Sequence, residues 1–191
     1  MTIEDGEAQL GKVSDIELWI GDYDYIFSDF DSRPYSERLL SEDLLSEMNR
    51  VSKDKKSEEV EVQFLIPNDK RDPKREVVIK KRLKDQFRIN LKNLKETKKK
   101  MLRQGLLFVL FGVVFMFIAT FFLTRGDGNY LITFLSVISE PAGWFLFWEG
   151  LNLLIFDIKK KVPDLDFYEK MSKAKINFAD TNPVKQTQNA L

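Results

Sequence analysis

An uncharged run of 19 residues, 105–123, constrains this chain more than any other feature of its sequence. At about 1.5 Å of rise per helical residue, that length matches the hydrocarbon core of a bilayer, which is about 30 Å thick. A second apolar stretch, residues 130–156, follows a short turn and is interrupted only by Glu140 and Glu149. The pattern predicts a transmembrane helix hairpin over residues 101–157, with spans at about 104–124 and 131–156.

Composition narrows the chemistry that the chain can perform. The 191 residues include no Cys and no His, so disulfides, thiolate nucleophiles and the commonest general base are excluded. Ser28, Ser36 and Ser41 have no base partner in the sequence pattern, and no glycine-rich phosphate loop is present. We therefore predict a non-enzymatic protein that needs neither a cofactor nor a metal.

The hydrophilic first half predicts a small α+β domain over residues 16–100. Alternating apolar residues predict strands at 16–20 and 60–66. A leucine-rich stripe predicts a helix over 34–51, and Asp72 followed by Pro73 marks the start of a second helix. That helix either bends near Asn90 or gives way to a short strand at 87–91. The predicted order is strand–helix–strand–helix.

The predicted domain is short of strands, and its flanks are polar. Two strands alone are marginally stable, so the domain requires a membrane contact, an unrecognised third strand or self-association.

We expect residues 1–15 to be a disordered leader, because they are acidic and lack the apolar core of a signal peptide. Residues 158–191 are expected to be a cytoplasmic tail, disordered from Asn177 onward.

Charge is distributed unevenly along the chain. Residues 1–50 carry 4 basic and 13 acidic side chains, whereas residues 51–100 carry 17 basic and 9 acidic ones. Basic residues flank both predicted spans on one side, and the turn between the spans carries only Arg125. The positive-inside rule therefore predicts that both termini are cytoplasmic. A basic run beside a membrane span indicates topology and anionic-lipid contact rather than nucleic-acid binding. The predicted lipid contacts are Lys95, Lys98, Lys99, Lys100, Arg103, Lys159, Lys160 and Lys161.

Glu140 and Glu149 are the candidate functional carboxylates, because ionisable groups inside a span are rare and face protein or water. Nine residues apart on a helix, they lie on opposite faces and do not form one site within a single copy. One interpretation is an ion or proton path in an oligomer. The other is a carboxylate hydrogen-bonded to a neighbouring helix, with Trp144 and Trp148 as interfacial anchors.

An aspartate-rich segment precedes the first predicted helix. Asp22, Asp24, Asp29 and Asp31 could offer oxygen ligands to Mg²⁺ or Ca²⁺, but the spacing lacks the glycine and terminal Glu of an EF-hand loop. Capping, turn formation and pairing with nearby arginines explain the pattern without a metal. We expect a surface for a cytoplasmic protein partner at Asp29, Asp31, Arg33 and Arg38.

Several motifs together resemble a prokaryotic family of uncharacterised small membrane proteins with two spans. The first is Ser28-Asp-Phe-Asp-Ser-Arg-Pro-Tyr-Ser-Glu-Arg38, followed by Leu40-Ser-Glu-Asp43. The others are Phe64-Leu-Ile-Pro67, Lys80-Lys-Arg-Leu-Lys84 and Ala142-Gly-Trp-Phe-Leu-Phe-Trp-Glu149. The likeness covers about residues 16–163. It implies a prokaryotic inner membrane and this architecture, and it implies no activity.

Two functional hypotheses follow from the sequence. The first is a non-enzymatic membrane protein with a binding, scaffolding or regulatory role that self-associates. Gly105, Gly112 and Ala119 recur every seven residues and would let helices pack closely. The second is a channel-like or transport-accessory oligomer in which Glu140 lines a path.

Overall fold

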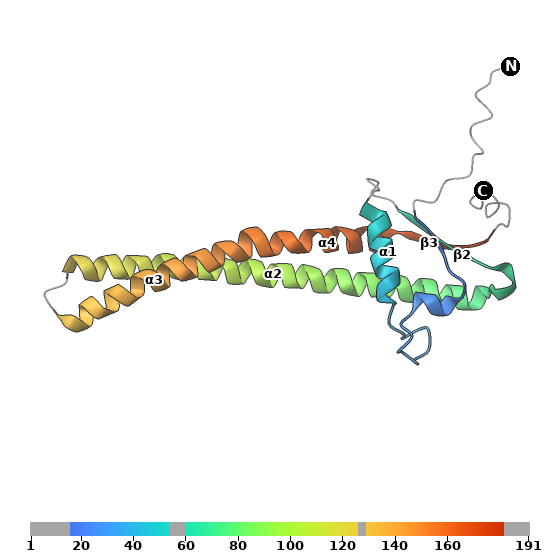
Figure 1. Ribbon diagram of the computed structural model, residues 1–191, viewed down its shortest axis with the longest axis horizontal. Coiled ribbons are helices and arrows are strands. Elements are labelled where there is room, and N and C mark those ends of the chain that lie inside the picture. Colours follow the sequence, from blue (N-terminus) through green and yellow to red (C-terminus); the bar gives the residue numbers. More distant parts are fainter. Residues whose placement is uncertain (1–15, 54–59, 126–128, 182–191) are drawn as a thin grey trace, which may run out of the picture. The chain divides into compact units, whose positions relative to one another are not determined.

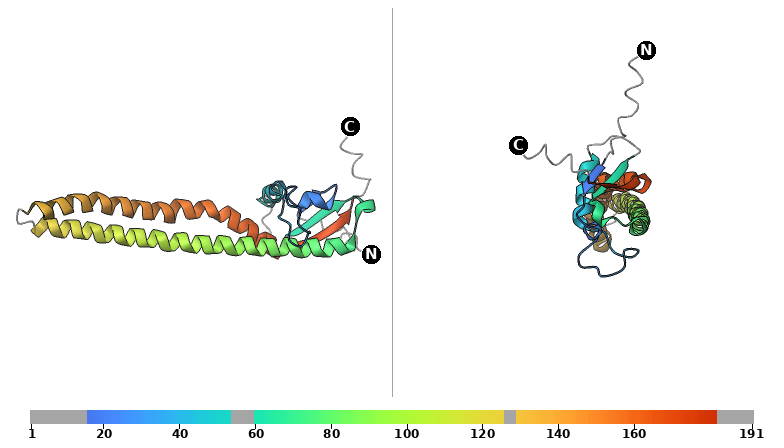
Figure 2. Two further views of the ribbon diagram at one scale, coloured as in Figure 1. Left: turned by 90° about the horizontal axis from the view of Figure 1, so that it is seen from below. Right: turned by 90° about the vertical axis from the view of Figure 1, so that its right-hand side faces the viewer.

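The protein is described by a computed structural model that covers residues 16–53, 60–125 and 129–181. The predicted leader, residues 1–15, lies outside the described residues. Contacts divide the chain into two compact units, one built from residues 1–90 with 167–191 and the other from residues 91–166. Figures 1 and 2 show the elements of both units.

The first unit is a parallel sheet with helices. The described residues form three strands in the order β1 (Ile16–Trp19), β2 (Glu61–Ile66) and β3 (Lys175–Asp180). The strands pair in parallel, so that Leu18 lies beside Phe64 and Phe64 beside Phe178. Helix α1 (Glu42–Lys53) connects β1 with β2. The helices α2 (Pro73–Arg125), α3 (Tyr130–Asn152) and α4 (Ile158–Lys173) all lie between β2 and β3 in the chain.

Alternate residues of the strands make the core of this unit. Val62, Phe64 and Ile66 are fully buried, and the Phe64 and Phe178 rings stack with centroids 5.4 Å apart. Helix α2 contributes one stripe with a four-residue spacing, which is the pattern of a helix with one buried face. Each large apolar side chain buried in this way stabilises the fold by about 1.5–3 kcal/mol. The helical members of the core are Ile79, Leu83 and Phe87 of α2, Leu44 and Met48 of α1, and Phe167 and Met171 of α4.

The third strand corrects the prediction for the C-terminal segment. Residues 158–191 were expected to be a tail, but residues 158–173 form α4 and residues 175–180 form β3. Ile176 and Phe178 are buried and alternate with the exposed Lys175 and Asn177, which is the signature of a half-buried strand. Of the three remedies considered for a short sheet, the unrecognised strand is present. The predicted order of strand–helix–strand–helix is therefore incomplete.

Two further predictions in this unit were wrong. The helix expected over 34–51 begins at Glu42, because Leu40 forms an antiparallel bridge with Phe27 and Ser41 N–H donates to Ile26 O at 3.0 Å. Those pairings hold the chain extended where the leucine spacing suggested a helix. The strand alternative at 87–91 is also wrong, since α2 is helical without interruption from Pro73 to Arg125, whereas the bend near Asn90 stays a prediction. The strand predictions at 16–20 and 60–66 and the helix start at Pro73 are confirmed.

The second unit contains the apolar part of α2 together with α3. A single π-helical turn, Leu153–Asp157, joins α3 to α4. Pro141 lies inside α3, which continues through it. Both α2 and α3 are long and apolar enough to cross a membrane, and 11% of the most apolar window of each is buried.

Candidate functional site

Glycines let α2 and α3 approach each other closely. A Cβ built on Gly112 would lie 2.5 Å from Phe147 N and 2.8 Å from Gly143 O. A Cβ built on Gly150 would lie 2.7 Å from Gly105 O. These neighbours are backbone atoms, so they could yield only by moving the helices apart. Close backbone approach at small residues is the usual way that helices associate in lipid.

The contacts define an antiparallel small-residue seam with one register. Gly105 meets Gly150, and seven residues further along α2, Gly112 meets Gly143, seven residues earlier on α3. Buried small residues continue the seam toward the turn between the helices. The α2 side of the seam is Gly105, Gly112 and Ala119, and the α3 side is Ser136, Ser139, Gly143 and Gly150. The seven-residue spacing noticed in the sequence therefore marks packing within the hairpin.

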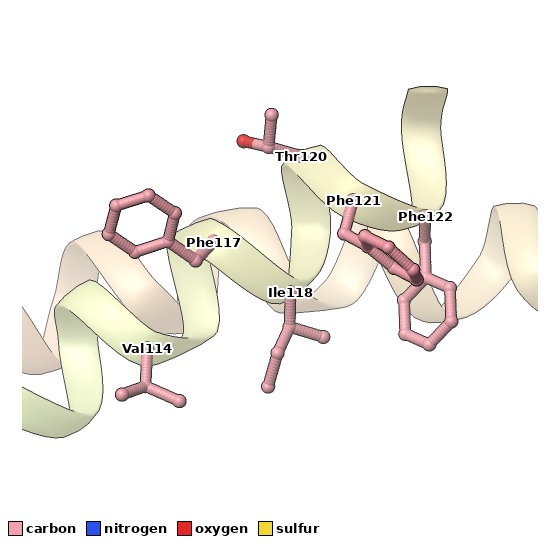
Figure 3. A pocket seen from close by; sticks show the side chains of 6 residues that line it. All are labelled: Val114, Phe117, Ile118, Thr120, Phe121 and Phe122. Carbon is pink, nitrogen blue, oxygen red and sulfur yellow. The ribbon is translucent and has the colours of Figure 1, made fainter. Parts of the chain in front are cut away.

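Outside the seam, the hairpin exposes large apolar side chains. Phe117 is 72% exposed and Phe145 is 69% exposed. An open hollow of about 520 Å³ lies on the outer side of α2 (Figure 3). All of its lining residues come from that one helix, so in a bilayer this hollow would be filled by acyl chains rather than by a specific ligand. The lining residues are Val114, Phe117, Ile118, Thr120, Phe121 and Phe122.

The two candidate carboxylates lie on α3 outside the seam. Glu140 is exposed and Glu149 is half-buried. Gly143 and Gly150 belong to the seam, and Glu140 lies three residues before the first of them, on the flank of the packed face. The structure does not bring Glu140 and Glu149 together, which agrees with their expected position on opposite faces.

The basic residues that flank the apolar segments are solvent-exposed in the second unit. Those of α2 and those of α4 are all exposed, and Lys160 Nζ pairs with Asp157 Oδ1 at 2.8 Å. In the register set by Gly105 and Gly150, residues shortly before Gly105 lie level with residues shortly after Gly150. The basic residues of both helices therefore lie at the same end of the hairpin. They are Lys95, Lys98, Lys99, Lys100 and Arg103 with Lys159, Lys160 and Lys161.

The predicted partner surface in the first unit is largely engaged in contacts of its own. Asp31 accepts two hydrogen bonds from the Arg33 guanidinium, at 2.9 and 2.7 Å, and one from Leu39 N–H at 2.8 Å. These bonds hold the pKa of the Asp31 carboxyl well below its usual range, the Arg33 side chain contributing most. Asp29 is exposed.

Arg38 ties the same loop to its surroundings. Its guanidinium pairs with Asp24 Oδ1 at 2.7 Å and donates to Asp31 O. Arg82 of α2 donates in turn to the carbonyls of Arg38 and Glu37, at 3.0 and 2.8 Å. Arginines that bond to several chain segments in this way order a loop rather than leave it available for a partner. The pairing interpretation of the aspartate-rich segment is the one that these contacts support.

A partly buried ion pair at the start of α2 was not predicted from the sequence. Arg71 binds Glu76 through two hydrogen bonds of 2.9 and 3.1 Å, and it also binds Asp180 at 3.0 Å. The Tyr23 hydroxyl donates to Glu76 Oε1 at 3.1 Å, and burial raises the pKa of that tyrosine. The partners raise the pKa of Arg71, the Glu76 hydrogen bond most of all. The positions of Arg71 and Glu76 on either side of a helix start could have indicated that these two residues pair. Nothing in the sequence indicated that Asp180 joins them.

A pair of exposed aromatic rings was missed as well. Trp19 is 61% exposed and Tyr25 is 62% exposed. Both rings approach Gly21, where a Cβ would lie 3.1 Å from Tyr25 Cε2 and 3.3 Å from Trp19 Cη2. Phe30, further along the same loop, is fully exposed. Adjacent exposed aromatic side chains are typical of protein-binding surfaces.

Two further observations bear on function. Within the described residues, no three acidic side chains come together in a way that could hold a metal ion. That the protein needs no metal remains a prediction from the sequence. No protein-family model, no curated protein and no solved structure matches this chain.

Proposed function

We propose that the chain is an integral membrane protein anchored by the α2–α3 hairpin. One observation carries this proposal: the apolar windows of both helices are long enough to span a bilayer, yet only 11% of each is buried by protein. A core helix of a soluble protein would be mostly covered. Because water would meet this apolar surface at a large free-energy cost, lipid is the solvent that fits it.

The sheet constrains the topology of this anchor. Strand β2 precedes the hairpin and β3 follows it, and the two strands pair along six residues from Glu61 to Ile66. Both ends of the hairpin must therefore lie on the same side of the membrane. The basic residues at those ends favour the cytoplasmic side, by the positive-inside rule. We propose a cytoplasmic (inner) membrane with both termini inside, in keeping with the resemblance to a prokaryotic family.

The cysteine-free chain allows a clean test of this topology. We would compare Asp127→Cys, between the two apolar helices, with Ser46→Cys, at an exposed position of α1. A membrane-impermeant maleimide added to intact cells should label the first variant, and it should label the second only after permeabilisation. Equal labelling of both variants in intact cells, or labelling of neither before permeabilisation, would contradict the proposed sidedness.

We further propose that the sheet unit is a non-enzymatic binding module for a cytoplasmic protein. Trp19 and Tyr25 support this role, because both rings are exposed to solvent. Tyr23, by contrast, is buried in the core, so the exposure of the other two rings is not explained by packing of the fold. A photo-crosslinking side chain at position 19 should give a discrete adduct in cells, and one at the exposed control position Lys74 should not. Identical adduct patterns from the two positions would refute the proposed surface.

An ion-conducting oligomer is the second candidate function. It is favoured by the exposure of Glu140 on the hairpin surface, since carboxylates of several copies could then face a path between them. Wild-type protein in liposomes should conduct ions and Glu140→Gln should not. If the wild type carries no flux, or if both proteins carry the same flux, this candidate fails and the anchored binding module stands.

A further inference from the structure

One face of α3 remains unpartnered beside the seam. Val137, Glu140, Trp144 and Trp148 follow one another at intervals of three or four residues, so they lie in one stripe, the Glu140 stripe. Val137 is 60%, Trp144 58% and Trp148 65% exposed, and Glu140 is exposed as well. The packing against α2 uses the neighbouring face of α3, so the Glu140 stripe is available to another molecule.

The seam register gives the depth of Glu140, on the proposed membrane insertion. Gly112 of α2 lies at the same depth as the segment of α3 between Gly143 and Phe147. Gly112 is also seven residues from Gly105, where the uncharged run begins. Glu140 is three to seven residues beyond that level, toward the turn. At about 1.5 Å per residue it lies about 15 to 20 Å from the cytoplasmic end of the run, near the middle of a core about 30 Å thick.

A carboxyl group at this depth needs a hydrogen-bonding partner. Among the described residues, Glu140 forms no hydrogen bond and no ion pair. The stripe also holds a backbone group without its usual helical donor: Pro141 has no N–H, so it cannot donate to the carbonyl of Val137. Leaving such groups in hydrocarbon costs several kcal/mol each, so the stripe favours a partner with polar groups at the same depth.

We propose that a second copy of this chain docks on the Glu140 stripe, in a parallel, twofold-symmetric contact between α3 helices. This proposal deepens the self-association expected for the anchored protein and rests on it. In a fixed topology, every copy carries Glu140 at the same depth, so a second copy always supplies a matching carboxyl. Lipid headgroups lie at the bilayer surface and do not reach that depth. The proposed hydrogen bond joins the two Glu140 carboxyl groups across the twofold axis.

Disulfide trapping tests the contact in native membranes. Val137→Cys places a sulfur in the stripe of an otherwise cysteine-free chain, and oxidation should give a covalent dimer. The matched control is Ile118→Cys, which is exposed on the outer side of α2 and should stay monomeric. Cross-linking of the control as readily as of Val137→Cys, or of neither, would overturn the proposal.

Association energetics provide a second, independent test. In liposomes, energy transfer between labelled copies should report association about 5- to 30-fold weaker for Glu140→Ala, from the loss of one hydrogen bond in lipid. Glu140→Gln keeps the hydrogen-bonding capacity and should associate more tightly than Glu140→Ala. Glu149→Ala, which removes a carboxylate from the opposite face, should associate like the wild type. Unchanged association of Glu140→Ala would refute the proposal.

The membrane anchor and the contact between copies can be tested separately. A protein that resists alkaline extraction from membranes but gives no Val137→Cys dimer supports the anchor and overturns only the proposed contact. A protein that alkaline extraction releases overturns the anchor, and the contact with it.

Discussion

Replacing Gly112 by Leu should loosen the hairpin, because a side chain at this glycine would meet the backbone of α3. A Cβ at this position would lie 2.5 Å from Phe147 N and 2.8 Å from both Gly143 O and Phe147 Cα. All three are backbone atoms, which cannot rotate away as a side chain would. The helices must therefore separate by roughly 1 Å, and overpacking of this kind typically costs about 1–3 kcal/mol. We expect Gly112→Leu to destabilise the hairpin by about 2 kcal/mol.

The assay is reversible unfolding in mixed micelles of mild detergent and dodecyl sulfate, followed by tryptophan fluorescence. A Trp19→Phe background leaves Trp144 and Trp148 of α3 as the only reporters. Val114→Leu is the matched control: it enlarges a side chain on the exposed side of the same helix, where there is room. If Gly112→Leu unfolds at the same detergent fraction as the control, the seam does not hold the helices together and the reasoning is refuted.

Three further predictions concern charge. Glu76→Gln should lower the free energy of unfolding by about 2 kcal/mol, because it removes the more buried of the two carboxylates that pair with Arg71 and leaves only the exposed Asp180; thermal unfolding of the purified protein measures this, and an unchanged midpoint would contradict it. Asp31→Asn should destabilise the protein at pH 7, whereas Asp29→Asn should not. Because folding depresses the pKa of Asp31, its stabilisation is fully present above its unfolded pKa, near 4, and is lost progressively as the pH falls from there toward the much lower folded-state pKa. The deficit should therefore be constant above about pH 5 and shrink steadily as the pH is lowered below about 4. A deficit that does not shrink at all between about pH 5 and pH 2 would exclude this origin. Glutamine at residues 98–100 should weaken binding to anionic vesicles by about 1 kcal/mol per lysine, with no change for neutral vesicles.

Local patterns in the sequence were sufficient for the elements that depend on neighbouring residues. The uncharged run predicted the apolar part of α2, and Asp72 with Pro73 predicted where that helix begins. The alternation around Phe64 predicted β2. In each case, a few adjacent residues determine the element: the length of an apolar run, a capping residue at a helix start, or the period of apolar residues in a strand.

The rest depends on contacts between residues that are distant in the chain. The apolar alternation of strand β3 is short, with Ile176 and Phe178 as its only large apolar residues, and it gains its place in the sheet by pairing with β2, where Phe178 meets Phe64. Leu40 fits a helical stripe, yet its pairing with Phe27 keeps it extended. The Arg71–Asp180 bond likewise joins residues 109 positions apart. The small-residue spacing at Gly105 and Gly112 was visible, but its partner glycines on α3 could be assigned only once the antiparallel register was known.

A depth measurement tests the central claim, that lipid surrounds the α2–α3 hairpin, most directly. Spin labels would be attached to Ile118→Cys, in the apolar run of α2, and to Lys99→Cys, in the basic segment before it, with the protein in lipid vesicles. If lipid surrounds the hairpin, the label at 118 should collide with dissolved oxygen far more than with a water-soluble nickel complex, and the label at 99 should show the reverse preference. Equal access of the nickel complex to both positions would show that water, not lipid, surrounds the hairpin.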